Sequence, residues 1–425
     1  MIKSMGMKTV LKFGGSSLGT PDRVRNVIGI IKERQAATAD PLMVVCSAFG
    51  GVTDHLIRLS TLAVDGDLTY KEQLLQLENR HLEAVRALVG VGRQTAVIAR
   101  VKFTLNELED VLHGCFLLRE CTPRTLDFVM SFGERLSAYI LAEALADSGM
   151  RAEFLDARQV IRTDDHFGYA RVDFDATETL ISEYISEHPF LQVVTGFIAT
   201  SPSGETTTLG RSGSDYTAAI LAAAVRAESL EIWTDVDGML TADPRLVRRA
   251  FTMPSMSYEE AMELSHFGAK VIFPATMRPA MNHQIPIWIK NTFNPTAKGT
   301  VIRGHDTDAR PIKGISSMGG ITLMNIQGSG LVGVVGVSMR LFTTMARENV
   351  NVVLISQASS EHSICVAISS SDAQRARISL EREFALEIAD GRIDEVHCTD
   401  KMAIIAVVGD GMKHQYRIER TDVRC

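Results

Sequence analysis

The sequence predicts an α/β protein with a mostly parallel sheet and helices on both faces, followed by a smaller α+β domain. Short apolar runs alternate with amphipathic helical runs through the larger part, and several apolar runs end in glycine-rich turns. Beyond residue 313 the order becomes strand, helix, strand, strand, helix, strand, as in ferredoxin-like domains. A chain of 425 residues with 45% hydrophobic residues is long enough for two or three domains.

The composition narrows the partners that we expect. The formal net charge is -7 and the sequence pI is near 5.9, so no electrostatic footprint for nucleic acid is present. The six cysteines form no C-x-x-C pair and have no nearby histidines at ligand spacing, which predicts reduced thiols and no zinc site. Without a signal-type segment or an apolar run long enough to span a bilayer, we expect a soluble, cytoplasmic protein with no membrane partner.

The first strand, Thr9 to Phe13, ends in Gly14-Gly15-Ser16-Ser17. Thr20 and Pro21 then predict the N-cap and first position of a helix. Lys12 ends the strand beside the glycine turn, where its ammonium suits phosphate oxygens. A lysine snorkelling from an edge strand fits this position equally well. The turn is not a Walker A loop, because the lysine precedes the glycines.

A second strand, Leu42 to Cys46, leads through the small-residue turn 47–53 into another helix. Ligands of open α/β sheets collect at such strand ends. The stretch from Tyr70 to Glu120 has helical periodicity throughout, and we assign no chemistry to it.

A further helical stretch, Pro123 to Asp147, contains Ser131-Phe132-Gly133-Glu134-Arg135-Leu136-Ser137, which predicts an interruption. Glu134 beside the glycine suits a cationic amine. The alternative is a solvated surface glutamate, which is the commoner situation.

Next come a strand at Ala152 to Leu155, a surface loop with Asp164-Asp165-His166, a helix at Asp175 to Ser186 and a buried strand at Gln192 to Ile198. A hairpin at 201–204 follows.

The hairpin leads to a loop that suits an anion. Gly210 and Gly213 allow a tight turn, Ser214 is the expected N-cap, and Asp215 falls in the first helical turn. Helix N-termini attract anions, and Arg211 adds a forked donor for carboxylate or phosphate. Asp215 could hold a metal or orient a cationic group. An ordinary capped helix explains the other residues but not an arginine between two glycines.

The following segments add polar groups at strand ends. Strand Leu230 to Thr234 precedes a turn rich in carboxylates at 235–243, which suits ribose hydroxyls or a metal, and Arg245 suits phosphate. Lys270 lies on another glycine turn, before strand Ile285 to Lys290. The polar stretch from 292 to 313 predicts a linker.

Five motifs in chain order resemble those of aspartate kinases of the amino acid kinase family, which carry C-terminal ACT regulatory modules. They are Lys12-Phe13-Gly14-Gly15-Ser16-Ser17, Gly210-Arg211-Ser212-Gly213-Ser214-Asp215, Trp233-Thr234-Asp235-Val236-Asp237-Gly238, Thr241-Ala242-Asp243-Pro244-Arg245 and Phe267-Gly268-Ala269-Lys270-Val271. The similarity runs nearly end to end. The segment 353–361 is most similar to the kinase half of bifunctional aspartokinase/homoserine dehydrogenases.

The resemblance implies an amino acid kinase fold at 1–303, an ACT-type domain at 304–425, and transfer of the ATP γ-phosphoryl group, with Mg²⁺, to the β-carboxylate of L-aspartate. It assigns catalysis to Lys12 and Asp215. Aspartate would be held by Ser47, Thr53, Glu134, Arg211 and Ser214. ATP would be held by Lys12, Gly14, Gly15, Ser16, Thr234, Asp235, Leu240, Arg245 and Lys270. Phosphoryl transfer to a carboxylate needs positioning and charge neutralisation but no general base.

The resemblance also implies an amino-acid effector, threonine in preference to lysine, at Gln357, Ser359, Ser360 and Glu361, and a homo-oligomer formed through the ACT domain. Family members often have Tyr at position 240, His at position 273 and a smaller residue at position 49. Leu240 would weaken nucleotide binding modestly, and Phe49 would narrow the aspartate pocket. Family chains continue into a second ACT module, so we expect the regulatory domain here to be truncated.

Two alternatives stay open. One is another amino acid kinase, acting on glutamate or carbamate, although the spacing of Ser47, Thr53, Glu134 and Arg211 favours aspartate. The other is a catalytically weak regulator that keeps the fold for effector binding, which the presence of Lys12 and Asp215 disfavours.

Overall fold

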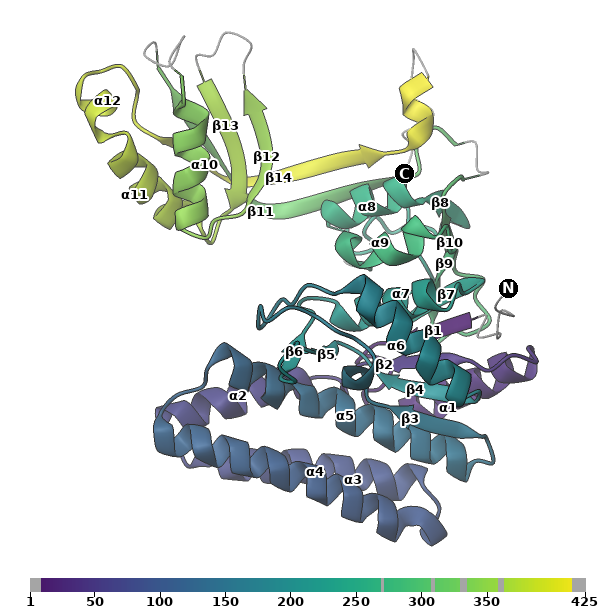
Figure 1. The fold of residues 1–425 in the computed structure, drawn as a ribbon. Coiled ribbons are helices and arrows are strands. Elements are labelled where there is room, and N and C mark those ends of the chain that lie inside the picture. The colour runs from purple at the N-terminus through teal and green to yellow at the C-terminus, as the bar shows by residue number, and fades with distance from the viewer. Residues whose placement is uncertain (1–8, 269–270, 307–309, 329–334, 358–362, 415–425) are drawn as a thin grey trace. The chain divides into compact units, whose positions relative to one another are not determined.

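The computed structural model describes residues 9–268, 271–306, 310–328, 335–357 and 363–414 (Figure 1). The chain divides into two compact units. Unit 1 comprises Met1–Gly314 together with Gly409–Cys425, and unit 2 comprises Ile315–Val408.

Unit 1 is built on an eight-stranded sheet of order β3-β4-β2-β1-β7-β9-β10-β8. The strands are β1 (Thr9–Phe13), β2 (Met43–Cys46), β3 (Ala152–Leu155), β4 (Leu191–Thr195), β7 (Ser229–Thr234), β8 (Ser255–Ser257), β9 (Ile287–Asn291) and β10 (Thr300–Arg303). Neighbouring strands are parallel, except that β10 runs antiparallel to β9. The mostly parallel sheet predicted from the sequence is confirmed.

The two faces of the sheet are buried against different helices. Leu11 and Phe13 belong to a cluster with α1 to α5, whereas the alternate residue Val10 is equally buried but lies outside that cluster. Side chains alternate between faces along a strand, so Val10 lies on the opposite face, and α7 is the helix that contacts β1, β2 and β7. The helices are α1 (Pro21–Ala36), α2 (Val52–Asp65), α3 (Thr69–Leu88), α4 (Val91–Leu118), α5 (Pro123–Asp147), α6 (Phe174–Glu187), α7 (Gly213–Ala224), α8 (Tyr258–His266) and α9 (Pro274–Asn282).

Three details differ from the sequence-based expectations. The long helical stretch divides at residues 89–90 into α3 and α4, which pack against each other beside α5 (Figure 1). The expected interruption of α5 is wrong, because the helix runs unbroken through Gly133. The stretch expected to be a linker contains β10, whose residues pair with both β8 and β9.

The predicted hairpin is present as β5 (Ile198–Thr200) and β6 (Thr206–Thr208), which form a separate antiparallel pair. The prediction of Thr20 as N-cap and Pro21 as first residue of α1 is also confirmed. The Thr20 hydroxyl accepts a hydrogen bond from the backbone N–H of Arg23.

Unit 2 has the predicted ferredoxin-like order, with a four-stranded sheet β12-β13-β11-β14. Its elements are β11 (Gly314–Gln327), α10 (Val337–Arg347), β12 (Val352–Gln357), β13 (Ser363–Ser369), α11 (Ala373–Glu383), α12 (Ala385–Ala389) and β14 (His397–Val408). Apolar side chains of α10 and α11, such as Leu341 and Leu380, pack against strand residues such as Met324 and Val366. A short 3-10 turn, η3 (Asp410–His414), follows in unit 1. Among the described helices, none combines the length and the apolar character that crossing a membrane requires.

Candidate active site

A polar pocket of about 400 Å³ lies where the loops after β1 and β2 meet the start of α7. It brings together eight of the residues predicted from the sequence. These are Lys12, Gly15, Ser47, Thr53, Glu134, Arg211, Ser214 and Asp215. They come from segments far apart in the chain. The loops after β1 and β2 meet because these parallel strands end at the same edge of the sheet, and α5 and the start of α7 bring the remaining residues.

An ion pair joins the two residues expected to be catalytic. Lys12 Nζ lies 2.6 Å from Asp215 Oδ1, and both side chains are about nine-tenths buried. The alternative of a lysine snorkelling from an edge strand is therefore wrong, since β1 is a central strand and Lys12 is one of the residues that line the pocket. A cation whose side chain is largely withdrawn from water interacts more strongly with phosphate oxygens than an exposed one does.

The loop before α7 has a different cap from the one predicted. The helix begins at Gly213, and Ser212 precedes it in the left-handed conformation with φ 56°, without a side-chain capping bond. Ser214 as N-cap is therefore wrong, and Ser214 lies within the first turn beside Asp215, as a lining residue of the pocket. Arg211, in the same loop, is exposed and also lines the pocket.

Glu134 is buried, so the surface alternative is wrong. Its Oε1 accepts a hydrogen bond from the backbone N–H of Ala48 at 3.1 Å, while its buried Oε2 has no hydrogen-bond partner among the described residues. Burial raises the pKa of Glu134 to about 8, an effect that the bond from Ala48 partly opposes. One turn later the Ser137 hydroxyl donates to Ser47 O at 2.7 Å, so α5 supports the whole turn after β2.

Gly133 explains how α5 comes so close to that turn. A Cβ atom on Gly133 would lie 2.8 Å from the Cβ of Ala48 and 3.4 Å from Val52 Cγ1. The glycine therefore serves close packing within an intact helix, and this approach places Glu134 against the pocket.

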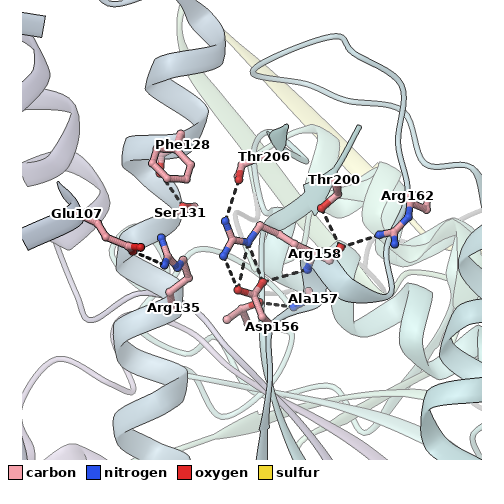
Figure 2. A network of polar contacts seen from close by, with 11 residues as sticks. Glu107, Phe128, Ser131, Arg135, Asp156, Ala157, Arg158, Arg162, Thr200 and Thr206 are labelled. Carbon is pink, nitrogen blue, oxygen red and sulfur yellow. Dashed lines mark hydrogen bonds and ion pairs between the residues drawn. The ribbon is translucent and has the colours of Figure 1, made fainter. Parts of the chain in front are cut away.

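A network of arginines fixes the hairpin that leads into the Arg211 loop (Figure 2). Arg158 forms a forked ion pair with Asp156, with Nη2 2.6 Å from Oδ2, and donates to the Thr206 hydroxyl on β6 at 3.0 Å. Its carbonyl accepts from the Thr200 hydroxyl on β5 at 2.8 Å and from Arg162 Nη1 at 2.7 Å. Both strands of the hairpin are thus tied to the turn after β3.

Figure 2 also shows Arg135, the residue after Glu134, reaching Glu107 on α4. The Nη2–Oε2 distance is 2.9 Å, and the guanidinium lies 4.5 Å from the centre of the Phe132 ring. This pairing of α4 with α5 holds the helix that carries Glu134.

Phe197 is a lining residue that the sequence did not reveal. It adopts φ 69°, a conformation uncommon for a bulky residue, and its ring approaches Gly213 so closely that a Cβ there would lie 2.6 Å from Phe197 Cδ2. The Thr217 hydroxyl on α7 accepts the Phe197 backbone N–H at 3.0 Å. No sequence signal marks this strain, because it depends on contact between two separate loops.

Four of the residues expected at the nucleotide lie at the end of β7 or beyond it and are not part of the pocket lining. They are Thr234, Asp235, Leu240 and Arg245. In the register, Phe13 pairs with Trp233, so Thr234 and Gly14 leave the sheet at the same edge. Arg245 is exposed and pairs with Asp243.

Hydrogen bonds connect the loop after β1 with β7 and with the residue that follows β9. The Ser17 hydroxyl shares a hydrogen bond of 2.7 Å with that of Thr292, next to β9, and approaches Trp233 O at 3.4 Å. Gly14 lies next to the lysine, because a Cβ atom there would be 3.4 Å from Lys12 Nζ. Ser16 O accepts from Arg23 Nη1 at 2.9 Å.

Some predicted site residues lie outside the described part of the chain. These are Lys270, Ser359, Ser360 and Glu361. Gln357 is the last residue of β12 and is exposed. Within the described residues, no group of three His, Cys, Asp or Glu side chains is arranged to hold a metal ion.

Two protein-family models match the chain. Residues 7–291 match the amino acid kinase family, and residues 324–384 match an ACT domain.

Named relatives are similar over nearly the whole chain. Bifunctional aspartokinase/homoserine dehydrogenase 1 of Arabidopsis thaliana, a chloroplastic protein, is 34% identical over 412 residues, covering 95% of this chain and 45% of the relative. The chain thus spans about half the length of that relative. Aspartokinase 1 of the same plant, also chloroplastic, is 31% identical over 429 residues, covering 99% of this chain and 73% of the relative.

A solved structure agrees with this similarity. E. coli aspartokinase III, in complex with aspartate and ADP, superposes with a TM-score of 0.80 at 28% identity, covering 97% of this chain and 89% of that one.

Proposed function

The chain belongs to the amino acid kinase family and, within it, to the aspartokinases, and we propose that it transfers the γ-phosphoryl group of Mg·ATP to the β-carboxylate of L-aspartate. The observation that carries the proposal is the convergence of Lys12, Glu134, Arg211 and Asp215 on one polar pocket. The set offers two cations for anionic groups and a buried carboxyl group whose ionised form suits an ammonium. An amino acid with two carboxylates matches this charge pattern.

We assign the chemistry to the two ends of the pocket. A β-carboxylate oxygen attacks the γ-phosphorus, the bond to the bridging oxygen breaks, and ADP leaves. Lys12 and the backbone of Gly14 and Gly15 neutralise and orient the phosphoryl group, and Asp215 keeps Lys12 in place at 2.6 Å.

At the other end, Arg211 pairs with the α-carboxylate of aspartate. Oε2 of Glu134, which has no hydrogen-bond partner among the described residues, accepts a hydrogen bond from the substrate's ammonium group. Ser47, Thr53 and Ser214 supply further polar contacts around the same substrate. Nucleotide contacts from Ser16, Thr234, Asp235, Leu240, Arg245 and Lys270 belong to this proposal as well.

The test is a steady-state hydroxamate assay of the purified chain with Mg·ATP and aspartate, glutamate or carbamate in parallel. Turnover with aspartate alone supports the proposal. Turnover with another acceptor makes the chain a different amino acid kinase, and no turnover with any acceptor favours a regulator that binds effectors without catalysis.

We further propose that unit 2 binds an amino-acid effector, threonine in preference to lysine, near Gln357, and that the chain forms homo-oligomers through this unit. The resemblance of segment 353–361 to bifunctional enzymes supports threonine, and the match to an ACT domain supports effector binding. A cytoplasmic location stays a prediction from the sequence, and the two plant relatives are chloroplastic proteins. Adding threonine or lysine to the hydroxamate assay separates the two effectors.

A further inference from the structure

Arg80, on α3, contacts the loops after β1 and β2, both of which contribute residues to the pocket lining. Its Nη2 nitrogen donates to Gly19 O at 3.1 Å and to Gly50 O at 2.8 Å. One nitrogen of a guanidinium carries two hydrogens, so both bonds form at once. Helix α3 belongs to the stretch of sequence that had no chemical assignment.

The two carbonyls belong to loops that carry different reactants under the proposed function. Gly19 ends the loop after β1, which holds the phosphoryl group, and Gly50 lies in the loop after β2, which holds aspartate. The loops already touch through their backbones, since a Cβ atom on Gly50 would lie 2.8 Å from Gly15 O. Arg80 therefore bonds to both sides of the contact that sets the distance between the reactants.

The next residue on α3 strengthens the same contact. His81 is fully buried, and its ring stacks on that of Phe49 with centroids 5.3 Å apart and an interplanar angle of 18°. Its Nδ1 lies 2.8 Å from Leu77 O, which fixes the ring, and burial lowers the pKa of His81 to about 4. Near neutral pH the ring is uncharged, which suits a stack inside the core. Two adjacent residues of α3 thus hold Phe49 and Gly50.

We propose that Arg80 is a positioning residue that fixes the separation between the phosphoryl-holding loop after β1 and the aspartate-holding loop after β2. This inference rests on the proposed function, because it is the two reactants that give the separation its meaning. In-line transfer depends on the reacting atoms being held at near-attack distance, and a displacement of about 1 Å can lower the rate about 10²-fold. Each loop keeps its own contacts with its ligand when Arg80 is lost, so kcat should fall more than either KM rises.

The test compares three variants of the full chain. R80M removes both bonds while keeping an unbranched apolar stem, and R80K retains a cation whose nitrogen is one bond closer to the backbone than Nη2 of arginine. R86M is the matched control, because Arg86 lies on the same helix and is exposed. Measurements are kcat, the KM of both substrates, and amide hydrogen exchange of residues 14–19 and 47–51.

We expect R80M to lose about 10- to 100-fold in kcat, with both KM values within about threefold of wild type. R80K should have a kcat between those of R80M and wild type, since its shorter side chain keeps the cation but not the reach to both carbonyls, and R86M should equal wild type. Exchange should become faster in both loops in R80M and in neither loop in R86M. A wild-type kcat in R80M, or a loss confined to KM, would overturn the inference.

Hydrogen exchange separates this inference from the proposed function. If the wild-type chain transfers no phosphoryl group to aspartate, the proposed function fails and Arg80 positions no reactants. Faster exchange in R80M then shows only that Arg80 joins the two loops. With wild-type activity present, unchanged exchange in either loop contradicts the role of Arg80 while leaving the proposed function intact.

Discussion

Lys12 and Asp215 form a pair in which each side chain neutralises the other in a largely buried place. We expect Lys12→Ala to lower kcat about 10²- to 10³-fold, because the transferring phosphoryl group loses its nearest cation. The double variant Lys12→Ala/Asp215→Ala should lose little more than the single variant, since the two residues act as a unit.

The measurement is kcat at saturating aspartate and Mg·ATP, with the melting temperature of each variant as a check on folding. Near wild-type kcat in Lys12→Ala would remove the lysine from the reaction. Losses in the double variant that equal the product of the two single losses would show that Asp215 acts independently of Lys12.

The buried Glu134 predicts how the stability of the substrate-free protein depends on pH. Its pKa is about 8 in the folded protein and near 4.5 in the unfolded chain, so between these values the folded state holds the extra proton. Stability therefore decreases as pH rises from about 4.5 to about 8, because unfolding releases this proton, and the decrease levels off above about 8, where the folded protein also loses the proton. Glu134→Gln cannot ionise, and its melting temperature should rise relative to wild type between pH 6 and pH 9.

The matched control is Glu83→Gln, at an exposed glutamate on α3. Its melting temperature should follow that of wild type across the same pH range. A constant offset between Glu134→Gln and wild type from pH 6 to pH 9 would mean that Glu134 is already ionised in the free protein.

At the scale of single residues, the sequence indicates which residues are candidates for the site better than it indicates whether they are buried or strained. Arg211 could be selected because an ordinary capped helix does not explain an arginine between two glycines. Lys12 and Asp215 fitted structural roles as well, and the family resemblance assigned them to catalysis. The burial of Glu134 could not be predicted, because a helical position becomes buried or exposed only through the neighbours that pack on it. The same applies to Phe197, whose strain arises from its contact with Gly213.

At the scale of elements, Gly133 shows how one missing side chain lets α5 approach the turn after β2. Gly133→Ala should push this turn away, since a Cβ would lie 2.8 Å from that of Ala48. We expect KM for aspartate to rise more than KM for ATP, because Ser47 and Thr53 flank the displaced segment.

Gly114→Ala on α4 is the matched control, since no atom lies within 4 Å of its added Cβ. There alanine should stabilise the helix by up to about 1 kcal/mol through its higher propensity, with kinetics unchanged. Thermal melting and steady-state kinetics of both variants test the comparison. Equal kinetics in the two variants would mean that the turn tolerates the extra methyl group.

Most elements could be predicted because apolar runs and helical periodicity are local signals. Strand β2 is continuous in apolar residues, β1 and β7 are partly apolar, and turns that contain glycine follow all three strands. The interruption expected at Gly133 was wrong because a glycine signals either flexibility or close approach, and only the packed structure distinguishes them. Arg80 was missed since one arginine among many on a long helical stretch has no distinguishing local pattern.

At the scale of the whole molecule, unit 2 leaves part of its sheet open. In β12, Leu354 and Ile355 are exposed at an edge strand, and in β14, Ile405 is exposed at the opposite edge. Unpaired strand edges with apolar side chains favour association with a second copy. We expect the chain to self-associate through the segment 350–368, and any threonine response to depend on this association, because an effector acts only through its different affinities for two states.

Ile355→Lys should therefore shift the chain toward monomer and weaken the threonine response, since a charge at the edge opposes pairing. Ile378→Lys is the matched control, because Ile378 is also an exposed isoleucine but lies on α11. Sedimentation velocity over a range of protein concentrations, together with hydroxamate assays across a threonine titration, tests both variants. A wild-type chain that is monomeric at all concentrations and fully inhibited by threonine would contradict both expectations. Equal association of the two variants would instead locate the interface away from β12.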